Sequence, residues 1–202
     1  VAKADGVLTL KQTEFTQTFG DEAFELGCSR TGDGTISYKV SDSKKADGTA
    51  ADDDNSVIKV SDTGVVTIVG AGSATITVSL SETECYTGAA EQTITVTVNQ
   101  ASAPTLASEN ISYVNTKGSG GAVTIDIADK LPENRGDTTY TVTNTTDSSG
   151  ILQNVAVDTT GKLTYTVISG KQVGDKASIT VTAQMANYES ATFTVNISIT
   201  DK

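Results

Sequence analysis

Apolar and polar residues alternate along most of this chain, which is the pattern of strands with one buried and one exposed face. Near the end of the first half, Ile94, Val96 and Val98 fall on one face, and threonines fill the other. The segments 74–80 and 193–199 follow the same alternation. Strands with one dry and one wet side are typical of antiparallel sheets. The pattern therefore predicts an all-β protein.

Turn signals divide the alternating segments into two series of strands. Glycine and aspartate gather at the breaks, as in 31–34 and 62–64, and these residues favour tight turns. In the first half we expect strands near 7–10, 13–19, 23–28, 35–41, 56–60, 65–69, 74–80 and 92–98. In the second half we expect strands near 111–114, 122–128, 138–143, 153–157, 162–168, 177–183 and 191–199. No segment has helical apolar spacing, and only 128–131 is expected to form a single turn.

The second half of the chain repeats the order of features in the first. An Ala-Thr-Ile-Thr-Val strand at 74–78 and a later Tyr86 are matched by 177–181 and Tyr188. A repeat of about 100 residues has the size of one domain. Two sheets stacked with their dry faces together form a sandwich. We therefore predict two tandem β-sandwiches, at 1–102 and 103–202.

Composition narrows the function classes. The chain has 34 threonines, no tryptophan and 5% aromatic residues, so its cores must be aliphatic. A net charge of -11 with only 14 basic residues argues against nucleic-acid binding, which needs clustered cations. No apolar stretch approaches the length of a membrane span, so no membrane insertion is expected. The acidity suits a soluble, extracellular protein.

The candidate chemistry is sparse. The chain contains no histidine, which removes Ser-His-Asp triads and most zinc sites. Two cysteines alone cannot complete a tetrahedral zinc shell. We therefore expect no enzyme activity, no catalytic residues and no cofactor.

Cys28 and Cys85 are the only cysteines. An even number of cysteines in an extracellular module favours pairing. A disulfide between them would close a loop of roughly 57 residues and contribute about 3–5 kcal/mol. We predict this disulfide, and the alternative is two separate thiols.

Asp52, Asp53, Asp54 and Asn55 form a concentrated acidic run. Their oxygen atoms suit Ca²⁺, but the spacing does not match a twelve-residue calcium loop. The prediction is a solvated surface loop within the long connection 42–55. Calcium binding is the alternative.

The stretch 56–78 resembles the signature of bacterial Ig-like domains. It contains a short strand, a Gly turn at Gly64, a second strand, a Gly-x-Gly corner at 70–72 and an Ala-Thr-Ile-Thr-Val strand. The second half resembles a divergent relative, in which 169–176 replaces the Gly-x-Gly corner. The resemblance implies immunoglobulin-like sandwiches of the kind found in bacterial surface and secreted proteins. Such modules act as spacers or adhesive segments and have no catalytic residues of their own.

The tyrosines separate two hypotheses about function. Tyr38, Tyr140 and Tyr165 fall at alternating core positions, and Tyr86 and Tyr188 precede the last strands. We expect the latter two to cap the cores and to hydrogen-bond across a corner. A carbohydrate-binding accessory module of a secreted glycoside-active enzyme would need exposed aromatic residues, so this interpretation is the alternative.

The leading prediction is a non-catalytic Ig-like module pair of a bacterial cell-surface or secreted protein. It would serve as a stalk, a spacer or a cell-adhesion segment. Its expected partners are neighbouring Ig-like modules of the same chain and a host or cell-surface protein or glycan. We expect the sequence to be a fragment of a longer secreted protein.

Overall fold

The computed structural model describes residues 2–51, 53–114 and 121–201. The chain divides into two compact units, Val1–Ala101 and Ser102–Lys202, one residue from the expected boundary. Within the described ranges the elements are strands and one short 3-10 helix, η1 (Ala128–Lys130). This confirms the all-β prediction, and η1 lies where a single turn was expected.

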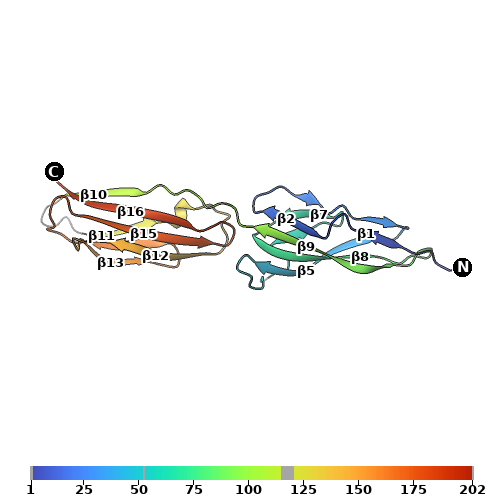
Figure 1. Ribbon diagram of the computed structural model, residues 1–202. Coiled ribbons are helices and arrows are strands. Elements are labelled where there is room, and N and C mark those ends of the chain that lie inside the picture. Colours follow the sequence, from blue (N-terminus) through green and yellow to red (C-terminus); the bar gives the residue numbers. More distant parts are fainter. Residues whose placement is uncertain (1, 52, 115–120, 202) are drawn as a thin grey trace. The chain divides into compact units, whose positions relative to one another are not determined.

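The described residues of the first unit form nine strands in three sheets. Their bounds are β1 (Val7–Thr9), β2 (Glu14–Thr18), β3 (Phe24–Glu25), β4 (Ser29–Thr31), β5 (Ile36–Lys45), β6 (Ile58–Val60), β7 (Val65–Ile68), β8 (Gly72–Leu80) and β9 (Ala89–Asn99). One sheet has the order β2-β9-β8-β5, a second has the order β3-β7-β6, and β1 pairs with β4. Figure 1 shows these strands in the right-hand part of the view.

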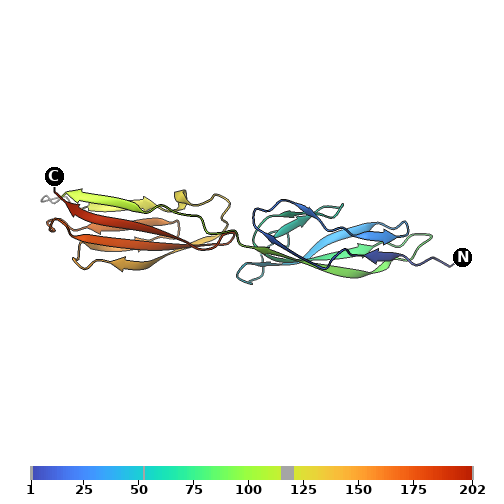
Figure 2. The same ribbon diagram turned by 45° about the horizontal axis from the view of Figure 1, so that its top comes forward.

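The second unit, in the part that the structure describes, contains seven strands in two sheets. Their bounds are β10 (Glu109–Val114), β11 (Gly121–Asp126), β12 (Thr138–Thr146), β13 (Leu152–Val157), β14 (Lys162–Val167), β15 (Lys176–Met185) and β16 (Ala191–Thr200). The larger sheet has the order β10-β16-β15-β12, and the smaller has the order β11-β14-β13. Its strands can be followed by colour in Figure 2.

The two units share one plan. Each has a four-stranded and a three-stranded sheet, and in each the first strand of the larger sheet pairs parallel to the last. Both also have a bulge at the same place in an edge strand, between Val40 and Asp42 in β5 and between Val142 and Asn144 in β12. The β1–β4 pair is an addition of the first unit, as far as the described residues show.

Each unit has an aliphatic core between its sheets, as the alternation predicts. On β8 every second residue from Gly72 to Leu80 is buried, and on β16 every second residue from Ala191 to Ile199 is buried. Among the described residues, the core of the first unit has no fully buried aromatic side chain, whereas Tyr165 and Phe193 are fully buried in the second. The threonines on the opposite faces of β8 and β16 are left for solvent or for partners.

Candidate functional site

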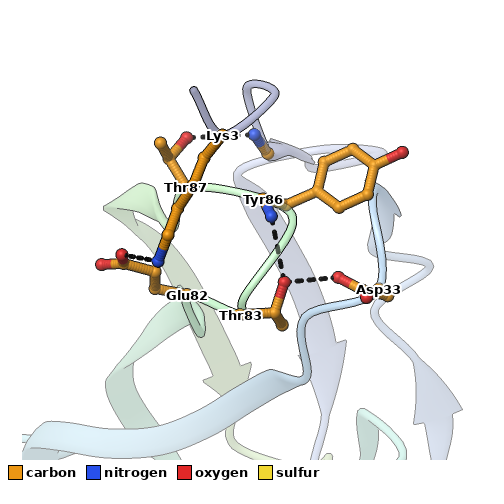
Figure 3. Close-up of polar contacts among 7 residues, drawn as sticks. Lys3, Asp33, Glu82, Thr83, Tyr86 and Thr87 are labelled. Atoms are coloured by element: carbon orange, nitrogen blue, oxygen red, sulfur yellow. Dashed lines mark hydrogen bonds and ion pairs between the residues drawn. The ribbon is translucent and has the colours of Figure 1, made fainter. Parts of the chain in front are cut away.

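The 81–88 loop, which connects β8 to β9, is anchored by hydrogen bonds to segments far from it in sequence (Figure 3). The N-terminal segment pairs with it: the Ala4 backbone N–H donates to the Cys85 carbonyl at 2.9 Å. In return, the Thr87 N–H donates to the Ala4 carbonyl at 2.9 Å. These bonds fix the loop although its residues and Ala4 lie about 80 positions apart in sequence.

Thr83 is the centre of the loop's side-chain hydrogen bonds. Its Oγ1 donates to Asp33 Oδ1 at 2.6 Å and accepts the Tyr86 backbone N–H at 3.1 Å (Figure 3). The Thr83 N–H also donates to the Tyr86 carbonyl at 3.0 Å. A single hydroxyl thus ties the loop to the turn that carries Asp33, and closes the loop on itself.

Two further contacts hold the ends of the loop. Lys3 and Glu82 form an ion pair (Figure 3), and the Gly6 N–H donates to Thr87 Oγ1 at 3.2 Å. Both side chains of the ion pair are solvent-exposed, so it contributes little to stability. The rigidity of the loop therefore comes mainly from its backbone pairing and from Thr83.

This arrangement gathers polar groups that can contact a partner. The side chains gathered here are carboxylates, hydroxyls, one lysine and one tyrosine, and the Asp33 carboxylate accepts the Thr83 hydroxyl. Within the described residues, no group of three His, Cys, Asp or Glu side chains is placed to hold a metal ion. A loop held this firmly presents a preformed surface, which lowers the entropy cost of binding.

No sequence signal marks this cluster. Asp33 and Thr83 are fifty positions apart, and no motif relates them. Turn chemistry marks both segments as loops, but only the fold places the two loops at the same end of the sandwich.

The structure contradicts the predicted disulfide, because Cys28 and Cys85 are both free. Cys28 is half-buried against the core of the first unit and hydrogen-bonds Tyr38. Cys85 is exposed in the 81–88 loop.

The N-terminal segment shows why the two thiols do not meet. Ala4 pairs beside Cys85, whereas Thr9 pairs with Ser29, the neighbour of Cys28. Five residues of nearly extended chain span about 16 Å. A disulfide needs Cα atoms within about 7 Å of each other, so the two cysteines lie at different levels of the sandwich.

The acidic run lies on the surface, in the connection between β5 and β6, and Asp52 is outside the described residues. Asp53 Oδ1 accepts the Asn55 N–H at 3.0 Å, which closes a local turn. The buried Ser43 hydroxyl donates to the Asp54 carbonyl and anchors the loop to β5. Asp53, Asp54 and Asn55 are exposed, as expected for a solvated loop.

The two repeated tyrosines behave differently. Tyr188 hydroxyl donates to Asn134 Oδ1 at 2.9 Å and its ring packs on a small core cluster, as predicted for a corner tyrosine. Tyr86 lies outside the main core cluster, and its ring lies against Gly32 instead.

Burial shifts the pKa of several groups in the cores. Burial, assisted by the hydrogen bond with Cys28, raises the pKa of Tyr38 to about 12. Burial also raises the pKa of the Cys28 thiol and that of Tyr165. At neutral pH all three groups are therefore uncharged, and Cys28 is a poor nucleophile.

Comparison with known proteins gives structural likeness only. No family model matches the chain, and no curated protein matches it. The human desmocollin-1 ectodomain is 12% identical, with a TM-score of 0.31 over 98% of this chain and 42% of that one. Drosophila N-cadherin EC1-4 is 14% identical, with a TM-score of 0.32 over 97% of this chain and 51% of that one.

Enzyme structures appear among the similar ones as well. An endo-fucoidan hydrolase of glycoside hydrolase family 107 is 14% identical, with a TM-score of 0.34 over 98% of this chain and 29% of that one. The chain thus spans about half or less of the length of these three structures. No helix in the described ranges is long and apolar enough to cross a membrane.

Proposed function

We propose that this chain is a non-catalytic Ig-like module pair of a bacterial cell-surface or secreted protein, and that it serves as a stalk or an adhesion segment. The observation that carries the proposal is the parallel pairing of the first and last strands of the larger sheet in each unit. β2 pairs with β9 from Glu14–Thr95 to Thr18–Asn99. β10 pairs with β16 from Glu109–Val195 to Val114–Thr200.

This pairing suits a load-bearing role. A pull on the two ends of a unit draws the parallel first and last strands past each other along their length. The ladder hydrogen bonds between them are then loaded together in shear, rather than broken one after another. The bacterial Ig-like resemblance at 56–78 and the acidic, threonine-rich surface support an extracellular setting.

Single-molecule force spectroscopy tests the load-bearing role. The chain is pulled first by its termini and then by cysteines introduced through Ser108→Cys and Thr192→Cys, with Cys28→Ser and Cys85→Ser in both cases. The introduced cysteines lie near the starts of β10 and β16, so this second pull unzips the pair. We expect the second unit to resist clearly higher force when pulled by its termini. Equal forces in the two geometries would contradict the proposal.

Adhesion is the second part of the proposal, and the 81–88 loop is the surface on which we place it. Its expected partner is a host or cell-surface protein or glycan. Beads coated with the chain should adhere to target cells, and a chain with Tyr86→Ser and Glu82→Lys should adhere less. Equal adhesion of both would place the contact elsewhere.

The accessory-module alternative has less support. Carbohydrate platforms of the stacking type need exposed aromatic rings. The exposed large apolar residues among those described are four valines, Val7, Val69, Val114 and Val173. Tyr38 and Tyr140 pack against the cores, and Tyr165 is fully buried.

A further inference from the structure

The outer face of the larger sheet in the second unit has a groove of about 520 Å³. It crosses β10, β16 and β15 and reaches the end of β12. Most of the residues that line it are polar. The residues used below are Asn110, Thr146, Lys176, Ser178, Asn196 and Ser198.

Strand register aligns these side chains. Asn110 pairs with Asn196, Asn196 with Ser178, and Ser178 with Thr146, so one row crosses all four strands. Neighbouring strands lie about 4.8 Å apart, which gives a line of hydroxyl and amide groups at regular spacing. Lys176 lies on the next row, paired with Ser198.

The row offers both donors and acceptors to a ligand. Asn196 Nδ2 donates to Asn110 Oδ1 at 3.0 Å. This bond leaves the amide N–H groups of Asn110 and the carbonyl oxygen of Asn196 for a ligand, together with the Ser178 hydroxyl. A ligand rich in hydroxyl groups can satisfy both kinds of group.

The charge of the groove differs from that of the chain. The chain carries a net charge of -11, yet the described lining of the groove contains Lys176 and no carboxylate. Lys176 has no ion pair within the described part of the chain.

Turn hydrogen bonds hold the nearest acids in sequence, which keep their charge but do not line the groove. Asp147 accepts the N–H groups of Ile151 and Leu152 at 2.7 and 2.9 Å. Asp175 accepts the Gln172 N–H at 2.9 Å.

The first unit has a groove at the corresponding end of its larger sheet. It has a volume of about 320 Å³ and is lined from the ends of β5 and β9 and the start of β8, including Lys45, Ser73 and Thr97. Its lining, over the described residues, also contains one lysine and no carboxylate. Two units that differ in most of their sequence thus each have a hollow at this end of the larger sheet, with one lysine in its described lining.

We propose that the groove on the second unit binds a glycan that contains uronic acid. The hydroxyl and amide row hydrogen-bonds the sugar hydroxyls, and Lys176 pairs with a ring carboxylate. The single cation of the lining can pair with one ring carboxylate, and the described lining offers no second cation for a densely sulfated glycan. Recognition relies on hydrogen bonds and charge rather than on aromatic stacking. The proposal does not depend on the load-bearing role.

Calorimetric titration of the full chain with oligogalacturonate at low salt tests the proposal. We expect saturable binding that weakens as salt is added and no binding of a neutral glucan. Lys176→Glu should weaken binding roughly tenfold or more, because it removes a charge-assisted hydrogen bond. Asn196→Ala should weaken it several-fold without any change in charge.

Lys59→Glu is the matched control, because Lys59 is an exposed lysine on β6 of the first unit. It makes the same charge change and should bind as the parent does, and unchanged thermal unfolding shows that each variant is folded. Three results would each overturn the proposal: no binding by the parent chain, equal weakening by Lys59→Glu, or dextran sulfate binding as tight as that of oligogalacturonate.

Discussion

The ring of Tyr38 lies directly against Gly64, in the turn that leads into β7. A Cβ atom at position 64 would come within 2.8 Å of the Tyr38 ring. Tyr140 and Gly161 repeat this relationship in the second unit, at 2.7 Å. The tyrosine belongs to the four-stranded sheet and the glycine to a turn of the three-stranded sheet. Each unit therefore joins its two sheets at the same point.

The turn that carries each glycine is closed in the same way. Ser61 Oγ accepts the Val65 N–H at 3.0 Å, and Asp158 Oδ1 accepts the Lys162 N–H at 3.0 Å. The N–H of Lys162 and the hydroxyl of Thr160 hold the pKa of Asp158 below its usual range. The repeated Thr-Gly turn thus positions a surface against which a tyrosine packs.

Gly161→Ala should destabilise the second unit by about 2–4 kcal/mol. The backbone at Gly161 has a φ of +89°, which costs a non-glycine residue about 1–2 kcal/mol. Displacement of the Tyr140 ring should add about 1–2 kcal/mol more. Denaturant unfolding measures the change.

Gly170→Ala is the control for this measurement. Gly170 has a φ of +73°, but a Cβ atom added there would have no neighbouring atom within 4 Å. This variant should lose only the stability that a positive φ costs an alanine, without any clash with a ring. Equal losses for the two variants would mean that the tyrosine contact contributes nothing.

Thr83→Val should loosen the 81–88 loop. Valine keeps the shape but removes the hydroxyl that binds Asp33 and the Tyr86 N–H, at a cost of about 1–2 kcal/mol. Amide hydrogen exchange at Tyr86 should speed up. Thr67→Val on an exposed face of β7 is the matched control, and it should leave exchange at Tyr86 unchanged.

The first unit should lose stability in alkali through Tyr38. The hydroxyl ionises near pH 10 in the unfolded chain, but its pKa is raised to about 12 in the folded unit. The stabilisation is therefore fully present below pH 10 and is lost as the pH rises from 10 to 12. With Tyr38→Phe, the free energy of unfolding should fall less between pH 10 and pH 12. Cys28 contributes in the same direction, so Cys28→Ser should be measured alongside.

The intact chain should contain two titratable thiols. Cys85 is exposed and should react rapidly with a thiol reagent in the native state. Half-buried Cys28, whose pKa is raised by burial, should react slowly until the chain is unfolded. A native mass two units below that of the reduced chain would show that a disulfide forms after all.

The two sandwiches could be predicted from the sequence because buried and exposed side chains alternate along most of their strands. The buried positions of β8 and β16 are those that the alternation marks as apolar. β5 was predicted too short, at 35–41 instead of Ile36–Lys45. The bulge after Val40 puts Ser41 and Asp42 on the outside together, which breaks the alternation that the prediction followed.

The sites were harder to predict, because they depend on which loops and strands are neighbours. The disulfide prediction was wrong. The positions of Cys28 and Cys85 along the chain do not reveal that the two residues lie at different levels of the first sandwich. The hydrogen bond from Thr83 to Asp33 and the row from Asn110 to Thr146 join residues far apart in sequence. In the sequence alone, each of these residues looks like an ordinary surface residue.

The sequence by itself determined the class of structure, the number of units and the positions of most strands, because solvent acts on each strand locally through the alternation of its side chains. Tertiary structure alone decided which strand lies beside which, that the first strand of each larger sheet runs parallel to the last, and which polar side chains share a row. These strand pairings and rows of side chains depend on sheet register and on loop closure over about 50 to 90 residues. The free energy of the whole fold sets the register and the loop closure, and no local sequence pattern encodes them.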